Sequence, residues 1–268
     1  MVYQFSMPPL VLYTFSTFNS EKLTAWAKTI HKVSDTATYF NFLASHDGIG
    51  MRPTEGILTE EERQMLVEKV LANGGRVSYK NNPDGTQSVY ELNINYSDAL
   101  INQDVDTTEE LQVQKMLAAH SILFSFIGVP AIYYHSYLGS RNDYKGLEES
   151  GINRRINREK LEYDRIVHEL TNDKRRQAIF NGMNRLIELR KNESAFSPFA
   201  EQQVLDFGPD VFALVRENKE TNEKISFIVN VTPKTIEVAT DFKGTDLFSG
   251  TAVDGKITLA PYQYMWIK

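Results

Sequence analysis

The most informative stretch of the sequence is Thr38-Tyr39-Phe40-Asn41-Phe42-Leu43-Ala44-Ser45-His46-Asp47-Gly48-Ile49-Gly50. Its first part, 38–43, is a β-rich apolar run, which is typical of a parallel strand buried on both faces. The run ends in polar side chains followed by two glycines. Because α/β folds place their chemistry at the carboxyl ends of such strands, this stretch predicts an α/β protein with candidate functional residues at 45–50.

Outward from this stretch, strand-like and helical segments alternate up to about residue 195. A second buried strand is expected where a Gly-Val-Pro break ends a long helix, and a polar loop is expected at 139–160. After residue 192 the helices stop, and short strands alternate with Gly, Pro, Asn and Asp turns, which predicts a small antiparallel unit. The expected helices are 10–18, 21–30 capped by Ser20, 59–72 capped by Thr59, 108–127 and 174–191, and the expected strands are 2–5, 38–43, 76–80, 87–93, 131–134, 204–207, 211–217, 224–230, 235–239 and 262–267.

The composition excludes several classes of protein. The 268 residues include 29 basic and 35 acidic side chains, for a net charge of −6, which argues against nucleic acid or an anionic membrane as the main partner. No apolar stretch resembles a spanning helix, and no basic residue precedes Lys22, so we expect neither a membrane segment nor a signal peptide. The absence of cysteine excludes disulfides and thiolate chemistry and fits a cytoplasmic location.

His46 and Asp47 are the first candidate pair. A carboxylate beside an imidazole at a strand end can stabilise positive charge on a substrate or bind a metal. In the alternative interpretation, Asp47 caps a turn and His46 bonds to the backbone. The other histidines show no regular ligand spacing, so we expect no metal and no cofactor.

The polar loop at 139–160 holds several arginines, including Arg154, whose planar guanidinium suits phosphate or sugar hydroxyls. The alternative is a solvated loop held by ion pairs to neighbouring carboxylates. Tyrosines such as Tyr90 can stack on sugars but can equally be packing residues. Neither a nucleophile elbow nor a glycine-rich phosphate loop is present, and the residues alone lead no further.

Five segments in order carry a more specific resemblance. Residues 42–50 resemble the strand-7 motif of the α-amylase superfamily in its sucrose-phosphorylase-like form. Gly128–Tyr134 resembles strand 8 of that barrel, and the closing strand of the family's C-terminal β-domain is similar to 261–267. Residues 139–144 and 153–160 resemble the loop after strand 8.

The resemblance implies an α-glucoside phosphorylase of glycoside hydrolase family 13. Such enzymes retain configuration: a carboxylate nucleophile forms a glucosyl-enzyme, a carboxylic acid protonates the leaving oxygen, and phosphate takes the glucosyl group. The substrates would be phosphate and an α-glucoside of the sucrose, sucrose 6′-phosphate or glucosylglycerate type. The product would be α-glucose 1-phosphate.

The family's functional residues match four positions of this chain. Asp47 matches the carboxylate that stabilises the oxocarbenium-like transition state, and His46 matches a neighbour that holds glucose hydroxyls. Arg154 matches the arginine that grips the reacting glucose. Tyr90 matches a mobile-loop tyrosine near the phosphate or acceptor site, whereas Glu91 departs from the glutamine expected in sucrose phosphorylase.

The nucleophile and the acid/base belong to strands 4 and 5 of this barrel, and the chain resembles only strands 6 to 8. We therefore expect a partial (β/α)₈ barrel at 1–197, with an inserted subdomain at about 50–107, and a C-terminal antiparallel β-domain at 198–268. Three strands cannot close a barrel, so one sheet edge and the inner face should be exposed. The chain alone should be inactive.

Two alternatives stay open at this stage. One is a hydrolase or transglycosidase of the same superfamily, with water or a sugar as acceptor. The other is a fragment or degenerate gene product that binds sugar or a partner without catalysis. An open half-barrel would also permit self-association or a partner chain.

Overall fold

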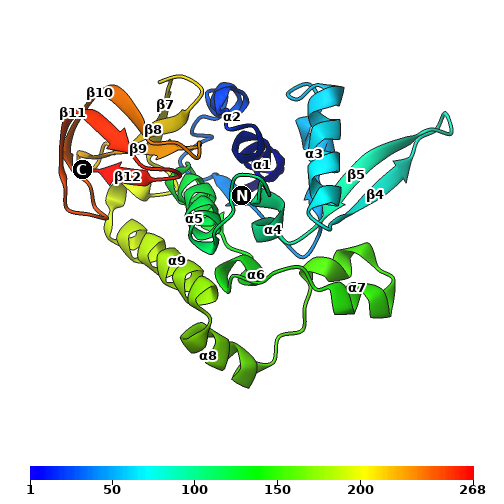
Figure 1. Ribbon diagram of the computed structural model, residues 1–268. Coiled ribbons are helices and arrows are strands. Elements are labelled where there is room, and N and C mark those ends of the chain that lie inside the picture. Colours follow the sequence, from blue (N-terminus) through cyan, green and yellow to red (C-terminus); the bar gives the residue numbers. More distant parts are fainter.

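The computed structural model describes all residues from Met1 to Lys268 (Figure 1). Its centre is a parallel sheet of three strands in the order β1-β2-β6. Helices α1 and α2 connect β1 to β2, and α5 precedes β6, so each crossover is helical as the sequence predicts. Neither outer strand pairs with a further strand. The elements are β1 (Val2–Tyr3), α1 (Met7–Thr17), α2 (Glu21–Ala27), β2 (Tyr39–Phe42), α5 (Glu109–Ser125) and β6 (Val129–Ala131).

Local sequence explains how β6 lies so close to β2. Gly128 has a φ of 116°, and a Cβ there would lie 2.7 Å from the Tyr39 carbonyl oxygen, so only glycine fits. The buried Asn41 side chain donates a hydrogen bond of 2.8 Å to the carbonyl of Ile127. This amide ties the centre of β2 to the chain entering β6.

One face of the sheet is uncovered. The exposed fractions of Tyr3 and Phe5 are 59% and 56%, and their rings lie 4.9 Å from Phe40 and 5.4 Å from Phe42, respectively, between centroids. We call these four aromatic side chains the open face. The expectation that 38–43 is buried on both faces is therefore wrong, because within β2 only Asn41 is fully buried. A sheet of three strands has no opposite barrel wall to cover its inner side.

Between β2 and α5 the chain forms a separate small sheet of order β3-β5-β4, and the β4–β5 hairpin projects from the body (Figure 1). Helix α3 begins with a capping box in which Thr59 and Glu62 bond to each other's backbone N–H, as its sequence suggests. The elements are β3 (Ile49–Gly50), a 3₁₀ turn (Arg52–Thr54), α3 (Glu60–Ala72), β4 (Arg76–Asn81), β5 (Gln87–Asn93) and α4 (Tyr96–Leu100).

The segment after β6 differs from expectation. The second strand ends at Ala131, and Tyr134 already opens a helix, so the strand expected at 131–134 lies about two residues earlier. The supposed loop 139–160 contains a helix, because Asp143 accepts a 2.8 Å hydrogen bond from the Gly146 N–H as an N-cap. The sequence analysis missed α8. The elements are α6 (Tyr134–Tyr137), α7 (Tyr144–Ser150), a 3₁₀ turn (Asn153–Asn157), α8 (Tyr163–Asn172) and α9 (Lys174–Asn192).

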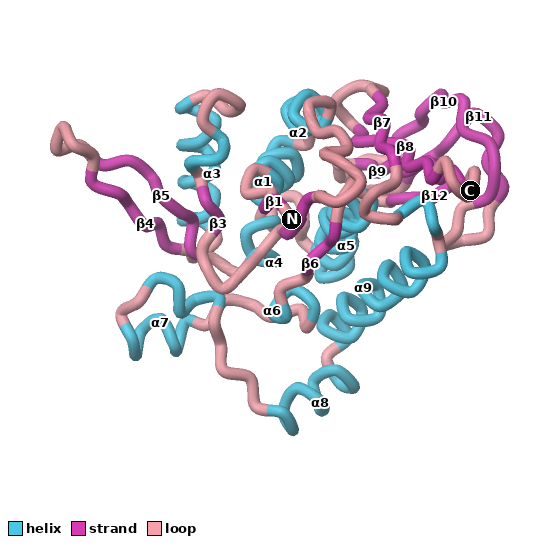
Figure 2. The backbone as a smooth tube through the Cα atoms, turned by 180° about the vertical axis from the view of Figure 1, so that it is seen from behind, coloured by secondary structure: helices cyan, strands magenta, loops and turns pink.

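The C-terminal strands form a four-stranded antiparallel sheet, β12-β9-β8-β7, and a β10-β11 pair. The sheet lies beside α5 (Figure 2). Fully buried Arg216 donates to the carbonyls of Ser125 and Phe126 at 3.1 and 3.0 Å, which joins β8 to the end of α5. After a 3₁₀ turn (Ser194–Phe196), the strands are β7 (Glu201–Leu205), β8 (Val211–Asn218), β9 (Glu223–Asn230), β10 (Ile236–Thr245), β11 (Ala252–Leu259), which the sequence analysis missed, and β12 (Tyr264–Ile267).

Ser20 does not cap α2, contrary to the prediction. Its hydroxyl instead donates a 2.5 Å hydrogen bond to the carbonyl of Val211, and the helix ends at Ala27 rather than at residue 30. A tertiary contact thus replaces the local one. No helix combines the length and the hydropathy that crossing a membrane requires.

A buried ion pair predicts a large loss of stability on neutralisation. Asp106 Oδ2 lies 2.7 Å from Lys115 Nζ, its Oδ1 accepts a 2.7 Å bond from the Tyr262 hydroxyl, and both charged side chains are at most 1% exposed. Asp106→Asn leaves a buried ammonium without a counter-charge, and should lower the free energy of unfolding by about 3–5 kcal/mol. Urea unfolding measures this loss. Asp254→Asn, in an exposed pair with Lys243, is the control and should have no measurable effect.

Stability should also fall in mild acid. Burial lowers the pKa of His120 from 6.5 to about 4, and its Nδ1 lies 2.8 Å from the Met116 carbonyl. Between these pKa values the unfolded state binds the proton and the folded state does not. The contribution of His120 to the free energy of unfolding is therefore complete above pH 6.5. It is lost as the pH falls towards 4, and the loss is at most about 3 kcal/mol.

Urea titrations at several pH values test this expectation. The variant His120→Gln should reduce the slope between pH 6.5 and 4 without abolishing it, because burial also lowers the pKa of His135 to about 4. An unchanged slope in the variant would contradict the assignment.

Candidate active site

The carboxyl end of β2 opens into a cavity of about 290 Å³. Its walls come from the segment after β2, from β5 and from the 3₁₀ turn that contains Arg154. The cavity also borders the open face through Phe5 and Phe42. The residues that line it include Phe42, Asp47, Gly48, Tyr90, Glu91 and Arg154.

Arg154 joins two carboxylates at this cavity. Its Nη1 lies 2.8 Å from Asp47 Oδ1, and its Nε donates a 2.6 Å hydrogen bond to Glu91 Oε1. The bond to Glu91 is the main cause that raises the pKa of Arg154 above its usual value. The guanidinium is thus fixed as a cation while its side chain remains 35% exposed.

Glycine at position 48 permits this arrangement. The Gly48 N–H donates a 2.9 Å bond to Glu91 Oε2. A Cβ on Gly48 would lie 2.6 Å from Asn93 Nδ2 and 2.7 Å from the Leu92 carbonyl oxygen. The chain after Asp47 can approach β5 this closely only without a side chain.

Asn157 and Arg158 hold the backbone on the other side of Asp47. Asn157 Nδ2 donates to the carbonyls of Ser45 and Asp47, both at 3.0 Å. Arg158 Nη2 lies 3.4 Å from Asp47 Oδ1, and its Nε donates to the His46 carbonyl. Arg158 is one of the loop arginines that the sequence analysis considered for phosphate or sugar hydroxyls, whereas that analysis assigned no role to Asn157 or Glu91.

The four candidate residues are only partly brought together. Asp47, Arg154 and Tyr90 line the cavity, with Tyr90 half-exposed. The His46 side chain is 73% exposed, and its Nε2 lies 3.7 Å from Asp47 Oδ1. His46 is not part of the cavity wall. No group of three or more His, Asp or Glu side chains is placed to hold a metal ion.

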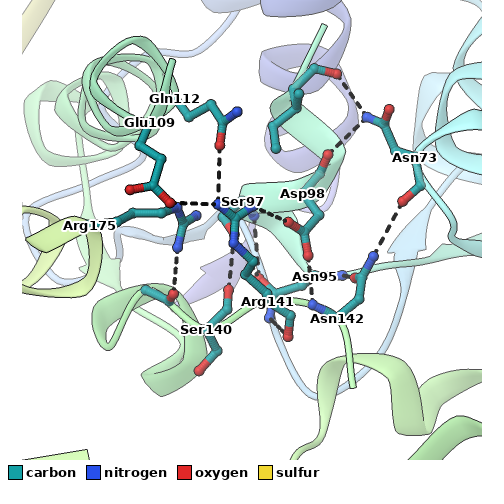
Figure 3. A network of polar contacts seen from close by, with 12 residues as sticks. Asn73, Asn95, Ser97, Asp98, Glu109, Gln112, Ser140, Arg141, Asn142 and Arg175 are labelled. Atoms are coloured by element: carbon teal, nitrogen blue, oxygen red, sulfur yellow. Dashed lines mark hydrogen bonds and ion pairs between the residues drawn. The ribbon is translucent and has the colours of Figure 1, made fainter. Parts of the chain in front are cut away.

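A second polar network anchors the segment between α6 and α7 (Figure 3). The Asp98 carboxylate accepts bonds from the Asn142 N–H at 2.6 Å and from Arg141 Nη1 at 3.2 Å. Burial raises the pKa of Asp98. The Ser97 hydroxyl donates to the Ser140 carbonyl at 3.0 Å. Arg141 therefore pairs with a carboxylate of α4 rather than with one of its own loop, and the segment entering α7 is fixed to α4.

The chain is similar to known proteins over its full length. No family model matches it. A glucosylglycerate phosphorylase of Escherichia coli is 44% identical over all of the chain, which covers 48% of that protein. One of Allomeiothermus silvanus is 41% identical over all of the chain, covering 47% of that protein. A sucrose phosphorylase of Streptococcus mutans is 26% identical over 88% of the chain. The chain is related over its whole length to glucosylglycerate phosphorylases and, more distantly, to sucrose phosphorylases.

Solved structures with the same arrangement of elements show the fold. A sucrose 6F-phosphate phosphorylase of Thermoanaerobacter thermosaccharolyticum matches 96% of the chain with a TM-score of 0.71 at 23% identity. An α-amylase from H. orenii matches 98% with a TM-score of 0.58. The predicted fold class, part of a (β/α)₈ barrel followed by an antiparallel β-domain, is confirmed. The chain spans about half the length of the relatives it matches.

The close approach of Gly48 to β5 predicts that a side chain at this position destabilises the fold. Gly48→Ala should lower the free energy of unfolding by about 1–3 kcal/mol, because the added methyl group meets backbone and a buried amide. Gly50→Ala is the matched control: its Cβ would meet only Pro53 Cδ, at 3.7 Å. Urea unfolding of both variants checks the expectation. Equal stability of the two would contradict the contact between residue 48 and β5.

Proposed function

We propose that the complete protein containing this chain transfers a glucosyl group from an α-glucoside to phosphate with retention of configuration. The bond from C1 to the leaving oxygen breaks as a carboxylate attacks C1, and a carboxylic acid gives its proton to that oxygen. A phosphate oxygen then displaces the carboxylate, giving α-glucose 1-phosphate. The barrel strands outside this chain would supply the nucleophile and the acid.

The single observation that carries the proposal is the Asp47–Arg154 pair in a cavity at the carboxyl end of β2. Barrel enzymes build their active sites at this end of the strands. The names of the relatives, phosphorylases of glucosylglycerate, sucrose and sucrose 6(F)-phosphate, support the same reaction class. Because three relatives of 41–44% identity are glucosylglycerate phosphorylases, we propose glucosylglycerate as the first substrate to test.

Each candidate residue has a role in this proposal. Asp47 stabilises the positive charge that develops at C1 and the ring oxygen. Arg154 and His46 bind glucose hydroxyls. Tyr90, on the β5 strand of the projecting hairpin, contacts the phosphate or the acceptor.

We also propose that further barrel strands cover the open face in the complete protein. Tyr3, Phe5, Phe40 and Phe42 would be covered by the remaining barrel strands, in the same polypeptide or in a partner chain. We propose domain limits of 1–197, with an insertion at 50–107, and 198–268. The chain alone would be inactive. The absence of cysteine supports a cytoplasmic location.

The reaction is tested by incubating the complete protein with glucosylglycerate, sucrose or sucrose 6′-phosphate, with and without phosphate. The expected result is phosphate-dependent release of α-glucose 1-phosphate. Free glucose formed at the same rate without phosphate would identify a hydrolase instead. No release from any of the three glucosides would contradict the proposal.

Asp47→Asn should lower kcat at least about 100-fold, because the amide no longer offers a negative charge to the transition state. Stability should change little, since the amide keeps an oxygen for Arg154. Asp164→Asn, on the exposed side of α8, is the control and should retain full activity. An Asp47→Asn protein with undiminished kcat would remove Asp47 from the mechanism.

A further inference from the structure

Glu91 uses both of its carboxylate oxygens within the protein. Oε1 accepts from Arg154 Nε at 2.6 Å, and Oε2 accepts from the Gly48 N–H at 2.9 Å. The side chain is only 6% exposed, although it lies in the wall of the cavity. Its oxygens are therefore directed at protein donors rather than at a ligand.

The backbone that carries Glu91 is itself fixed. In the small sheet, Glu91 lies opposite Ser78 of β4 and Gly50 of β3. The Met51 N–H also donates a 3.1 Å bond to the carbonyl of Tyr90. The carboxylate thus extends from a paired strand, which is a more rigid support than a loop.

Only a carboxylate can make this bridge. The two partners are both N–H donors, so the side chain must present two acceptors in one plane. A glutamine presents one oxygen and one NH₂ group, and the NH₂ would face one of the donors without a bond. An unpaired buried donor is costly, so one of the two contacts would open.

The bridge leaves Arg154 with a defined free end. Its Nε is held by Glu91 and its Nη1 by Asp47, so Nη2 is the end that carries neither contact. Rotation of the guanidinium about its own axis would break at least one of the two interactions. Arg154 is therefore held in one orientation before any substrate binds.

We propose that Glu91 is a positioning residue, whose carboxylate holds Arg154 against Asp47 and at the same time fixes the backbone at Gly48. The proposal rests on the proposed function, in which Arg154 binds glucose. In this account residue 91 acts on the reacting glucose through Arg154 and does not select the acceptor. The inserted hairpin thereby sets the geometry of the barrel residues.

Kinetics of the complete protein provide the first test. Glu91→Gln should lower kcat by about 10- to 100-fold, because the arginine is no longer held in place, while KM changes little. The loss should be equal for all three glucosides. Glu91→Asp keeps two acceptor oxygens on a shorter side chain and should recover part of the activity. Glu223→Gln removes another carboxylate that is largely buried, in β9 and 3.6 Å from Lys268 Nζ, and is the matched control that should retain kcat.

A spectroscopic readout on the same protein does not depend on activity. In protein labelled with ¹⁵N-arginine, the Arg154 Nε–H should give a slowly exchanging downfield signal, assigned by its loss in Arg154→Lys. The signal should survive in Glu91→Asp and Glu223→Gln and disappear in Glu91→Gln. If the wild type releases no sugar phosphate, the proposed function fails, yet this signal still decides whether Glu91 holds Arg154.

Two results would overturn the proposal. A Glu91→Gln protein with normal kcat but a changed preference among the glucosides would make residue 91 an acceptor contact. A Glu91→Gln protein with unchanged kcat and an unchanged Arg154 signal would make the bridge irrelevant to the site.

Discussion

The Arg154 guanidinium lies between the carboxylates of Asp47 and Glu91, and the candidate site depends on this three-residue contact. One carboxylate follows a barrel strand, the other lies on the inserted hairpin, and the arginine comes from the segment after β6. Backbone contacts also hold these elements, but the two carboxylates meet only through the arginine. Close opposite charges in a partly desolvated cavity attract far more strongly than on the surface, so the contact joins three distant segments into one site.

The second constraint is the open sheet. A parallel sheet is stable when both faces are covered, and here Tyr3 and Phe5 of the open face remain exposed. The rest of the chain is held together without using that face. The buried ion pair of Asp106 and Lys115 and the hydrogen bonds of Arg216 to the end of α5 do this. The chain therefore combines a well-packed outer half with an inner face suited to further barrel strands.

Prediction from the sequence succeeded where the signals are local. The apolar run before His46 predicted β2, and Thr59 with Glu62 predicted the start of α3. It failed where a tertiary contact determines the partner of a side chain: the Ser20 hydroxyl bonds to the Val211 carbonyl instead of capping α2. The Glu91 bridge could not be predicted, because its partners lie more than 40 and more than 60 residues away in sequence. The resemblance to a family marked Asp47 and Arg154 but not the residues that hold them.

The most direct test of this account is the native mass of the protein purified from its source, measured together with dye binding to exposed apolar surface. If the open face is covered by further barrel strands, the species should be well above the 30.6 kDa of this chain, as one longer polypeptide or a stable complex, and should bind little dye. A folded monomer of 30.6 kDa that binds no dye would contradict the claim that this chain is part of a larger barrel enzyme.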